Sequence, residues 1–168
     1  MLAHMTPRAP VLAKTCTISE PEYPEVWRLH GANAPAGASI PQLPNTCEVL
    51  ALGGSRALWR APNTWLVIGP GAQAACAELS ETSLYDLINL TGAFARIRCD
   101  GPAWRLLLQS GCPLDLEGDA APGRCAASVF GPFDILIDVV EENEAHVFVA
   151  RSYADDLAAA LARARRSL

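Results

Sequence analysis

The residues that could do chemistry are few, and they are widely spaced along the chain. Asp138, His146 and Ser152 supply an acid, a base and a hydroxyl group, the side chains of a hydrolase triad. Nothing in their spacing supports that arrangement. Ser152 begins a Ser-x-x-Asp capping box, which predicts a structural role at the start of a helix. His146 begins a strand beside an acidic turn, and we expect it at the surface, paired with Glu144.

Six cysteines could in principle bind a metal or form disulfides. They lie at positions 16, 47, 76, 99, 112 and 125, and none belongs to a Cys-x-x-Cys pair. This spacing argues against a zinc site. The first ten residues lack the apolar core of a signal peptide, and the cysteines lie within apolar patterns. We therefore expect free, buried thiols in a cytoplasmic protein.

Two other stretches carry groups that often bind ligands. Gly69-Pro70-Gly71 lies between a predicted strand and a predicted helix, where a phosphate could bind. It lacks the remaining glycines of a nucleotide loop, and Pro70 has no amide donor, so we interpret it as a plain turn. Asp115 lies between two leucines, and we expect it to cap a turn or to pair with Arg124 or Arg105.

Composition narrows the class of protein further. The chain has 168 residues, of which 51% are hydrophobic and 18% charged, with a formal net charge of −5. An acidic chain is poorly suited to binding nucleic acid. No run reaches the roughly 18 apolar residues of a membrane span. We predict a globular protein with no catalytic, cofactor-binding or metal-binding residue of its own.

The stretch over residues 100–116 predicts one complete helix that begins near Pro102 and ends at Gly111, followed by an ordered turn over residues 112–116. Pro102 suits the first helical position, Gly111 could end the helix in the left-handed conformation, and Pro113 prevents its continuation. An apolar stripe follows helical spacing at Trp104, Leu107 and Leu108. No group that could do chemistry lies in this stripe, so the helix is predicted to pack.

The remaining pattern predicts an α+β fold. Helical spacing occurs at residues 72–79, and a final helix follows Ser152 with Leu157, Leu161 and Ala164 on one face. Strands are predicted over residues 47–52, 57–60, 65–68, 83–90, 94–99, 125–130, 133–140 and 145–151. The order indicates antiparallel sheets built from split strand-helix-strand units, with the helices packed on one face.

The first quarter of the chain lacks such a pattern. Residues 1–24 and 31–46 are rich in Pro, Gly and Ala, and Trp27 lies between them with few apolar neighbours. We predict two parts: an irregular N-terminal arm over residues 1–46 and an α+β domain over residues 47–168. Such an arm would order most easily against a partner.

Several motifs resemble one known family when they are taken together and in order. They run Leu58-Trp59-Arg60-Ala61-Pro62-Asn63-Thr64-Trp65-Leu66, Gly101-Pro102-Ala103, Leu107-Leu108-Gln109-Ser110-Gly111-Cys112-Pro113-Leu114-Asp115-Leu116, Gly123-Arg124-Cys125-Ala126 and Val149-Ala150-Arg151-Ser152-Tyr153-Ala154. Over about residues 25–165 the chain resembles the gamma subunit of heterotetrameric sarcosine oxidase.

This resemblance implies a fold related to the folate-binding domain of the glycine-cleavage aminomethyltransferase. It also implies an accessory role beside alpha, beta and delta subunits, which would hold FAD, FMN, NAD and zinc and transfer the one-carbon unit to tetrahydrofolate. The complex would oxidatively demethylate an N-methyl amino acid. We expect the chain to contact neither nucleic acid nor membrane, and to use Trp27, Trp59, Arg124 and Arg151 at subunit interfaces.

Two alternatives stay open from the sequence. The fold relation would also suit a stand-alone folate-binding or folate-dependent one-carbon protein, in which Asp115 or Asp138 would hold the pterin ring. A third hypothesis is an assembly factor that leaves the complex after maturation.

Overall fold

The computed structural model describes residues 15–31, 43–80, 85–118 and 120–168, which fold into two five-stranded sheets. Sheet A has the strand order β1-β7-β10-β9-β8, and every neighbouring pair is antiparallel. Its strands are β1 (Thr17–Ile18), β7 (Phe94–Asp100), β8 (Cys125–Phe130), β9 (Phe133–Glu141) and β10 (Glu144–Ala150).

Sheet B lies between β1 and β7 in the chain, so the polypeptide leaves sheet A once and returns to it. Its strand order is β3-β4-β5-β2-β6, again antiparallel throughout. The strands are β2 (Val26–Gly31), β3 (Val49–Leu52), β4 (Ser55–Ala61), β5 (Thr64–Ile68) and β6 (Tyr85–Asn89).

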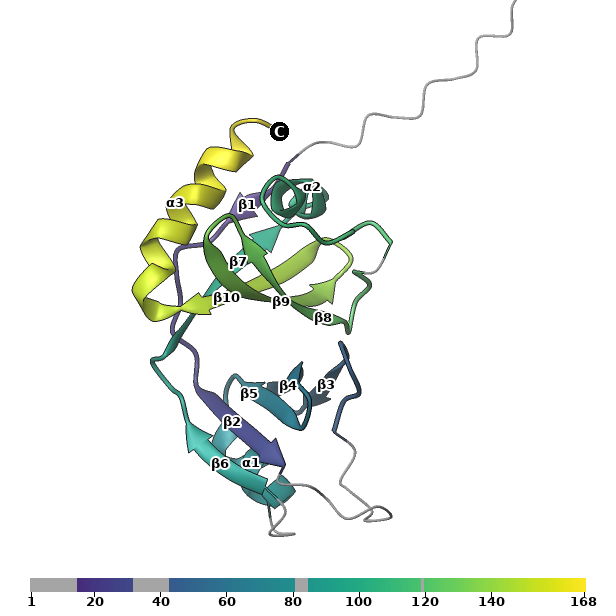
Figure 1. The fold of residues 1–168 in the computed structure, drawn as a ribbon, viewed down its shortest axis with the longest axis vertical. Helices are drawn as coiled ribbons and strands as arrows, with labels where there is room; N and C mark the ends of the chain where they lie inside the picture. Colours follow the sequence, from purple (N-terminus) through teal and green to yellow (C-terminus); the bar gives the residue numbers. More distant parts are fainter. Residues whose placement is uncertain (1–14, 32–42, 81–84, 119) are drawn as a thin grey trace, which may run out of the picture.

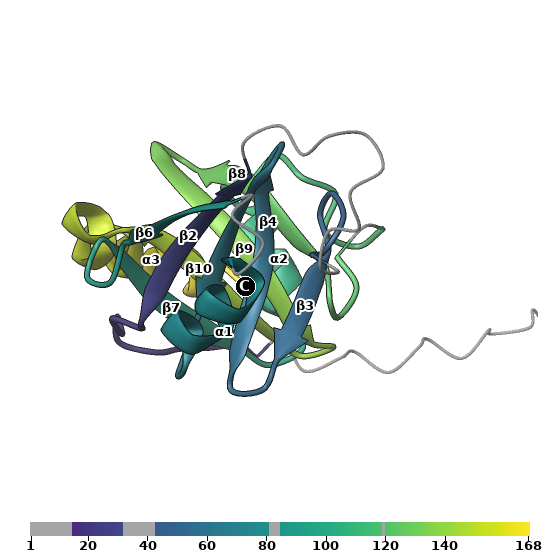
Figure 2. The same cartoon turned by 90° about the horizontal axis from the view of Figure 1, so that it is seen from below.

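The helices cover the outer faces of the two sheets. They are α1 (Ala72–Ser80), α2 (Trp104–Gln109) and α3 (Ala154–Arg165), the last preceded by the 3-10 turn η1 (Arg151–Tyr153). Figure 1 shows α2 and α3 on one side of sheet A and sheet B on the other. Figure 2, seen from below, shows α1 against the strands of sheet B, and it contacts β2, β4, β5 and β6. The α+β prediction is confirmed.

Three apolar clusters hold these layers together. Between the helices and sheet A, every second residue of β7 (Ala95, Ile97, Cys99) is fully buried, as its alternation predicts. Between sheet B and α1, a smaller cluster contains Ala57, Val67, Ala72 and Cys76. The two sheets face each other across a cluster of Val26, Leu58, Leu66, Ile68, Cys125, Leu136 and Phe148.

The prediction of an irregular arm over residues 1–46 is wrong where the structure describes that stretch. Residues 26–31 form β2, an inner strand of sheet B between β5 and β6, and residues 17–18 form β1. Strand β2 escaped notice because its sheet-A-facing side carries Arg28 and His30 as well as Val26, which hides the apolar alternation. Residues 1–14 and 32–42, also assigned to the arm, lie outside the described residues.

The helix predicted from Pro102 to Gly111 is shorter at both ends than its sequence signals indicate. Only Trp104–Gln109 is helical, although the predicted stripe of Trp104, Leu107 and Leu108 is fully buried. Gly111 does not take the left-handed conformation. It allows close packing instead, since a Cβ atom there would lie 2.9 Å from the ring of Phe130.

The predicted capping box at Ser152 is also wrong. Ser152 lies inside η1, and the N-cap position of α3 is Tyr153, which makes no side-chain capping hydrogen bond. Helix α3 has acidic side chains in its first turn and basic ones in its last, which suits the helix dipole. Leu157 and Leu161 are fully buried, as predicted. None of the described helices is long and apolar enough to cross a membrane.

Candidate functional site

Asp138, one member of the conceivable triad, is held between the two sheets by an arginine. Its carboxylate is fully buried and accepts two hydrogen bonds from Arg56, from Nε at 2.7 Å and from Nη2 at 2.8 Å. These bonds raise the pKa of the Arg56 guanidinium above its ordinary value, so the guanidinium stays charged. The arrangement joins β9 of sheet A to β4 of sheet B and has a structural purpose.

His146 lies directly across from Asp138 in the pairing of β10 with β9, but its ring bonds elsewhere. Its Nε2 atom lies 2.9 Å from Oε1 of Glu144, which confirms the predicted pair. The predicted surface position is wrong, because only 8% of the residue is exposed. Burial lowers the pKa of His146, against the opposing effect of Glu144, so the neutral ring is favoured. Ser152 lies in η1 and no triad forms.

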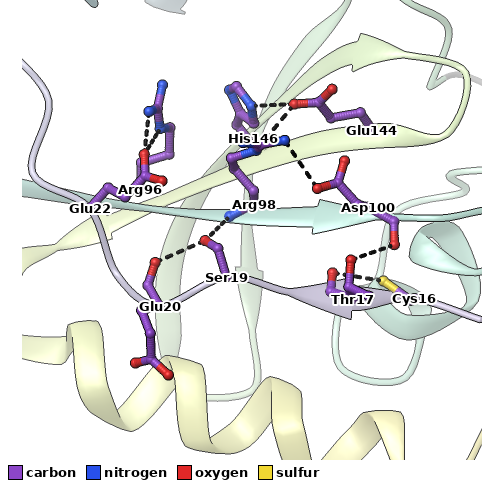
Figure 3. Close-up of polar contacts among 10 residues, drawn as sticks. All are labelled: Cys16, Thr17, Ser19, Glu20, Glu22, Arg96, Arg98, Asp100, Glu144 and His146. Carbon is purple, nitrogen blue, oxygen red and sulfur yellow. Dashed lines mark hydrogen bonds and ion pairs between the residues drawn. The ribbon is translucent and has the colours of Figure 1, made fainter.

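A polar cluster fastens the N-terminal segment to β7. Figure 3 shows Glu22 meeting Arg96 in an ion pair and Ser19 Oγ accepting the backbone N–H of Arg98 at 3.0 Å. The Arg98 guanidinium lies 3.1 Å from Asp100 and 3.4 Å from Glu144. Arg96 and Arg98, on the opposite face of β7 from its buried side chains, therefore have a structural role: they hold the N-terminal segment and Glu144 against β7.

A mostly apolar cavity of about 270 Å³ lies at the β8 edge of sheet A. Asp115 reaches its wall, where Oδ1 accepts the backbone N–H groups of Glu117 and Gly118, each at 3.2 Å. This confirms the prediction that Asp115 caps a turn, and the alternative ion pairs with arginine do not form. The lining residues are Cys47, Leu114, Asp115, Leu116, Ala120, Arg124, Cys125, Ala126, Ile137 and Val139.

The thiol in this wall is suited to packing. Burial raises the pKa of Cys125 to about 12, so it keeps its proton at neutral pH. Its Sγ atom donates towards the carbonyl oxygens of Glu48 and Trp59, at 3.3 and 3.4 Å. All six cysteines are free and five are buried, with Cys47 half-buried, which confirms that prediction. Within the described ranges, no three His, Cys, Asp or Glu residues gather as a metal site.

The turn at Gly69-Pro70-Gly71 leads into α1, whose first amides already have a protein partner. Oε1 of Glu25 accepts the backbone N–H of Gln73 at 2.9 Å and the indole N–H of Trp27 at 3.1 Å. A carboxylate from the chain itself thus lies where a phosphate would need to bind. This favours the plain turn over the nucleotide site.

Sequence reasoning missed a second pocket, of about 250 Å³, on the face of sheet B that looks towards sheet A. It is lined by Arg28, His30 and Thr64. His30 Nδ1 lies 2.9 Å from Thr64 Oγ1, and the Thr64 hydroxyl donates to the Pro62 carbonyl at 3.3 Å. The Nε atom of Arg28 is shielded from solvent and has no hydrogen-bond partner among the described residues. The alternation of Val26, Arg28 and His30 was the signal that could have placed these side chains together.

The four residues predicted at subunit interfaces do not form one surface. Trp59 and Arg124 both adjoin Glu48, through the Trp59 amide at 3.3 Å and an ion pair of Arg124 at 3.7 Å. Trp27 is half-buried against the α1 cluster. Arg151 lies near the start of α3, with its guanidinium 4.8 Å from the ring centre of Tyr23. Their place in an interface stays a prediction.

Comparison with known proteins identifies a family whose sequence model matches most of the chain. The sequence model of the sarcosine oxidase gamma subunit family matches residues 31–165. The fold is similar to that of a chain in heterotetrameric sarcosine oxidase from Corynebacterium sp. U-96, solved in complex with pyrrole 2-carboxylate. That alignment has a TM-score of 0.78 and 17% identity, and covers 92% of this chain and 85% of that one.

A second structural alignment is too weak to indicate a shared fold. It is with the ligand-free regulatory subunit of aspartate kinase from Thermus thermophilus, at a TM-score of 0.43 and 14% identity, covering 89% of this chain and 95% of that one. The search of curated proteins by sequence finds no match.

Proposed function

The chain belongs to the sarcosine oxidase gamma subunit family, and from this we propose that it is the accessory subunit of a heterotetrameric, flavin-dependent complex. The complex oxidatively demethylates an N-methyl amino acid. The observation that carries the proposal is the family match over residues 31–165. The similar fold of a chain in a heterotetrameric sarcosine oxidase supports it.

The role we propose within the complex is structural. This is supported by the way the reactive side chains are used in the fold. Asp138 is occupied by Arg56, His146 by Glu144, and the Cys125 thiol by two backbone carbonyl groups. The Asp138 and Cys125 bonds join the two sheets and the His146 bond lies within β10, so each group already has a partner inside the fold, which favours a rigid body that other subunits bind.

The chemistry is assigned to the partners in this proposal. Alpha, beta and delta subunits hold FAD, FMN, NAD and zinc, and transfer the one-carbon unit to tetrahydrofolate. We place the assembly in the cytoplasm, where free thiols such as the six found here stay reduced. Trp27, Trp59, Arg124 and Arg151 remain the proposed contact residues.

Co-expression with the partner subunits tests the proposal. The chain is tagged and produced together with the flavoprotein subunits of a sarcosine oxidase-type complex, and the mass of the purified assembly is measured by native mass spectrometry. We expect one copy of this chain in each active complex. An active complex that lacks the chain would instead favour an assembly factor that leaves after maturation.

Calorimetry distinguishes the proposed structural subunit from the alternative, a stand-alone folate-binding protein. The isolated chain is titrated with tetrahydrofolate, and the proposal expects no measurable heat of binding. Micromolar binding that is lost in the Asp115→Asn variant would favour a stand-alone folate protein. Asp138 is a poor pterin ligand because Arg56 already occupies both of its oxygen atoms.

A further inference from the structure

Arg28 in β2 is a cation that lacks a counter-ion in the described part of the chain. Its backbone lies between Leu66 of β5 and Ile88 of β6, in the middle of sheet B. No described carboxylate forms an ion pair with it, and its shielded Nε donor has no acceptor there. An arginine that is partly removed from water without a partner is unfavourable, so its partner is expected outside the described residues.

The surroundings of Arg28 indicate which chemistry would satisfy it. The pocket beside it is lined by His30 and Thr64, whose mutual bond at 2.9 Å holds the imidazole in place. Ile88, the cross-strand neighbour of Arg28, exposes 38% of its surface, which is unusual for a large apolar residue. The sheet therefore places the half-buried Arg28 guanidinium next to an exposed apolar side chain.

The position of this feature in the fold leaves it open to another chain. Strand β6 is the last strand of sheet B, and Figure 1 shows it at the outer side of β2. Asp86 of β6 lies across from His30 and is exposed, yet it makes no ion pair with Arg28 among the described contacts. The nearest carboxylate on the same strand pair thus leaves the guanidinium free.

We propose that Arg28 receives an aspartate or glutamate side chain from an acidic segment of a partner subunit, with a neighbouring apolar side chain of that segment packed on Ile88. The inference rests on the proposed function, because it needs a partner subunit. A guanidinium binds a carboxylate through two parallel hydrogen bonds, a geometry that lysine cannot reproduce. The occupant we commit to is this acidic segment.

Competition for a place in the complex tests the proposal. Wild-type and variant full-length chains carry different tags and are co-expressed with the other subunits, and native mass spectrometry measures the ratio in which they are incorporated. Arg28→Glu should be incorporated at least about 30-fold less than wild type, because it removes one partner of a buried ion pair and adds repulsion. The incorporation of Arg28→Lys should lie between that of wild type and that of Arg28→Glu, because lysine keeps the positive charge and lacks the two-point geometry of the guanidinium.

Two controls keep loss of folding apart from loss of binding. Arg163→Glu, on the exposed face of the last turn of α3, makes the same charge change and should be incorporated as wild type is. Arg28→Met removes the guanidinium without introducing a negative charge. If Arg28→Glu fails to fold, the incorporation of Arg28→Met is measured instead. Thermal melting of each isolated chain shows which variants fold. Equal incorporation of wild type and a folded Arg28 variant would overturn the inference and leave the proposed function standing.

Photo-crosslinking identifies the occupant. A photoreactive amino acid replaces Ile88 in the full chain, and the crosslinked peptide is sequenced after the complex is irradiated. A peptide from a partner subunit that contains Asp or Glu supports the inference. A second copy of this chain, or a partner peptide without an acidic residue, overturns it. If the wild-type chain does not enter a complex at all, the proposed function itself fails.

Discussion

Arg56 and Asp138 are 82 residues apart in the chain, yet they join sheet B to sheet A through a two-point ion pair. The Asp138 side chain is buried, and 27% of the Arg56 side chain is exposed. The pair lies beside the apolar cluster that the two sheets share, and it helps to set how they align. A buried charge pair is sensitive to the loss of either member.

Replacing Arg56 by Met should lower the free energy of unfolding by about 3–5 kcal/mol, because Asp138 is left buried with no positive partner. Urea denaturation at pH 7 measures this change. The double variant Arg56→Met with Asp138→Leu should be more stable than Arg56→Met alone, since no isolated charge remains.

A surface pair provides the matched control for this experiment. Arg124 and Glu48 lie 3.7 Å apart with 44% and 43% of their side chains exposed. Arg124→Met should cost only about 0–1 kcal/mol. Equal losses in the Arg56 and Arg124 variants would contradict the structural role of the buried pair.

Acidification should destabilise the fold through His146. Burial lowers the pKa of this histidine from 6.5, so the unfolded chain binds the proton more readily than the folded chain does. Its contribution to stability is therefore present above about pH 6.5 and is lost as the pH falls to the folded pKa. The Glu22 carboxylate, whose pKa Arg96 lowers from 4.5, acts only at lower pH.

Urea denaturation between pH 5 and pH 8 measures this effect. In wild type the free energy of unfolding should fall below pH 6.5, and the His146→Gln variant should show a flatter profile over the same range. Identical profiles for the two proteins would mean that another group titrates in this window.

Alkaline pH should act through Cys125. Burial raises its pKa from 9.0 to about 12, so its stabilising effect is complete below pH 9 and declines as the unfolded chain releases the proton. Cys125→Ala costs stability at pH 7 because it removes a buried side chain. That cost should shrink by about 1.4 kcal/mol for each pH unit above 9, which urea denaturation up to pH 10.5 can follow. A cost that does not change with pH would contradict the assignment.

Local patterns predicted the elements whose packing is regular. Strand β7 alternates strictly because one side faces the helices and the other carries polar pairs, so residues 94–99 were correctly assigned. The α1 spacing and the β9–β10 hairpin were equally visible. The prediction failed for β2 for two reasons. Its partner strands β5 and β6 come later in the chain, and its polar residues Arg28 and His30 line a pocket, which interrupts the apolar alternation.

The contacts that define the candidate sites join residues far apart in the chain, so they could not be predicted from local sequence patterns. Nothing near Asp138 in the sequence points to Arg56, because the two meet only when the sheets pack. Glu25 capping α1 through Gln73 is likewise a contact across 48 residues. The resemblance to a family supplied the proposed function, whereas the residues alone indicated only that no familiar catalytic motif was present.

Gly111 provides a test of how tightly the α2 end packs on β8. A Cβ atom at this position would lie 2.9–3.1 Å from three ring atoms of Phe130, which is itself buried, so the ring has little room to move. Gly111→Ala should lower the free energy of unfolding by about 1–3 kcal/mol through overpacking. Thermal or urea denaturation measures the loss.

Phe130→Leu makes room for the new methyl group, so the double variant should lose less stability than the two single variants added together. Strict additivity of the two single losses would contradict the close approach of this ring as the cause of the Gly111→Ala loss.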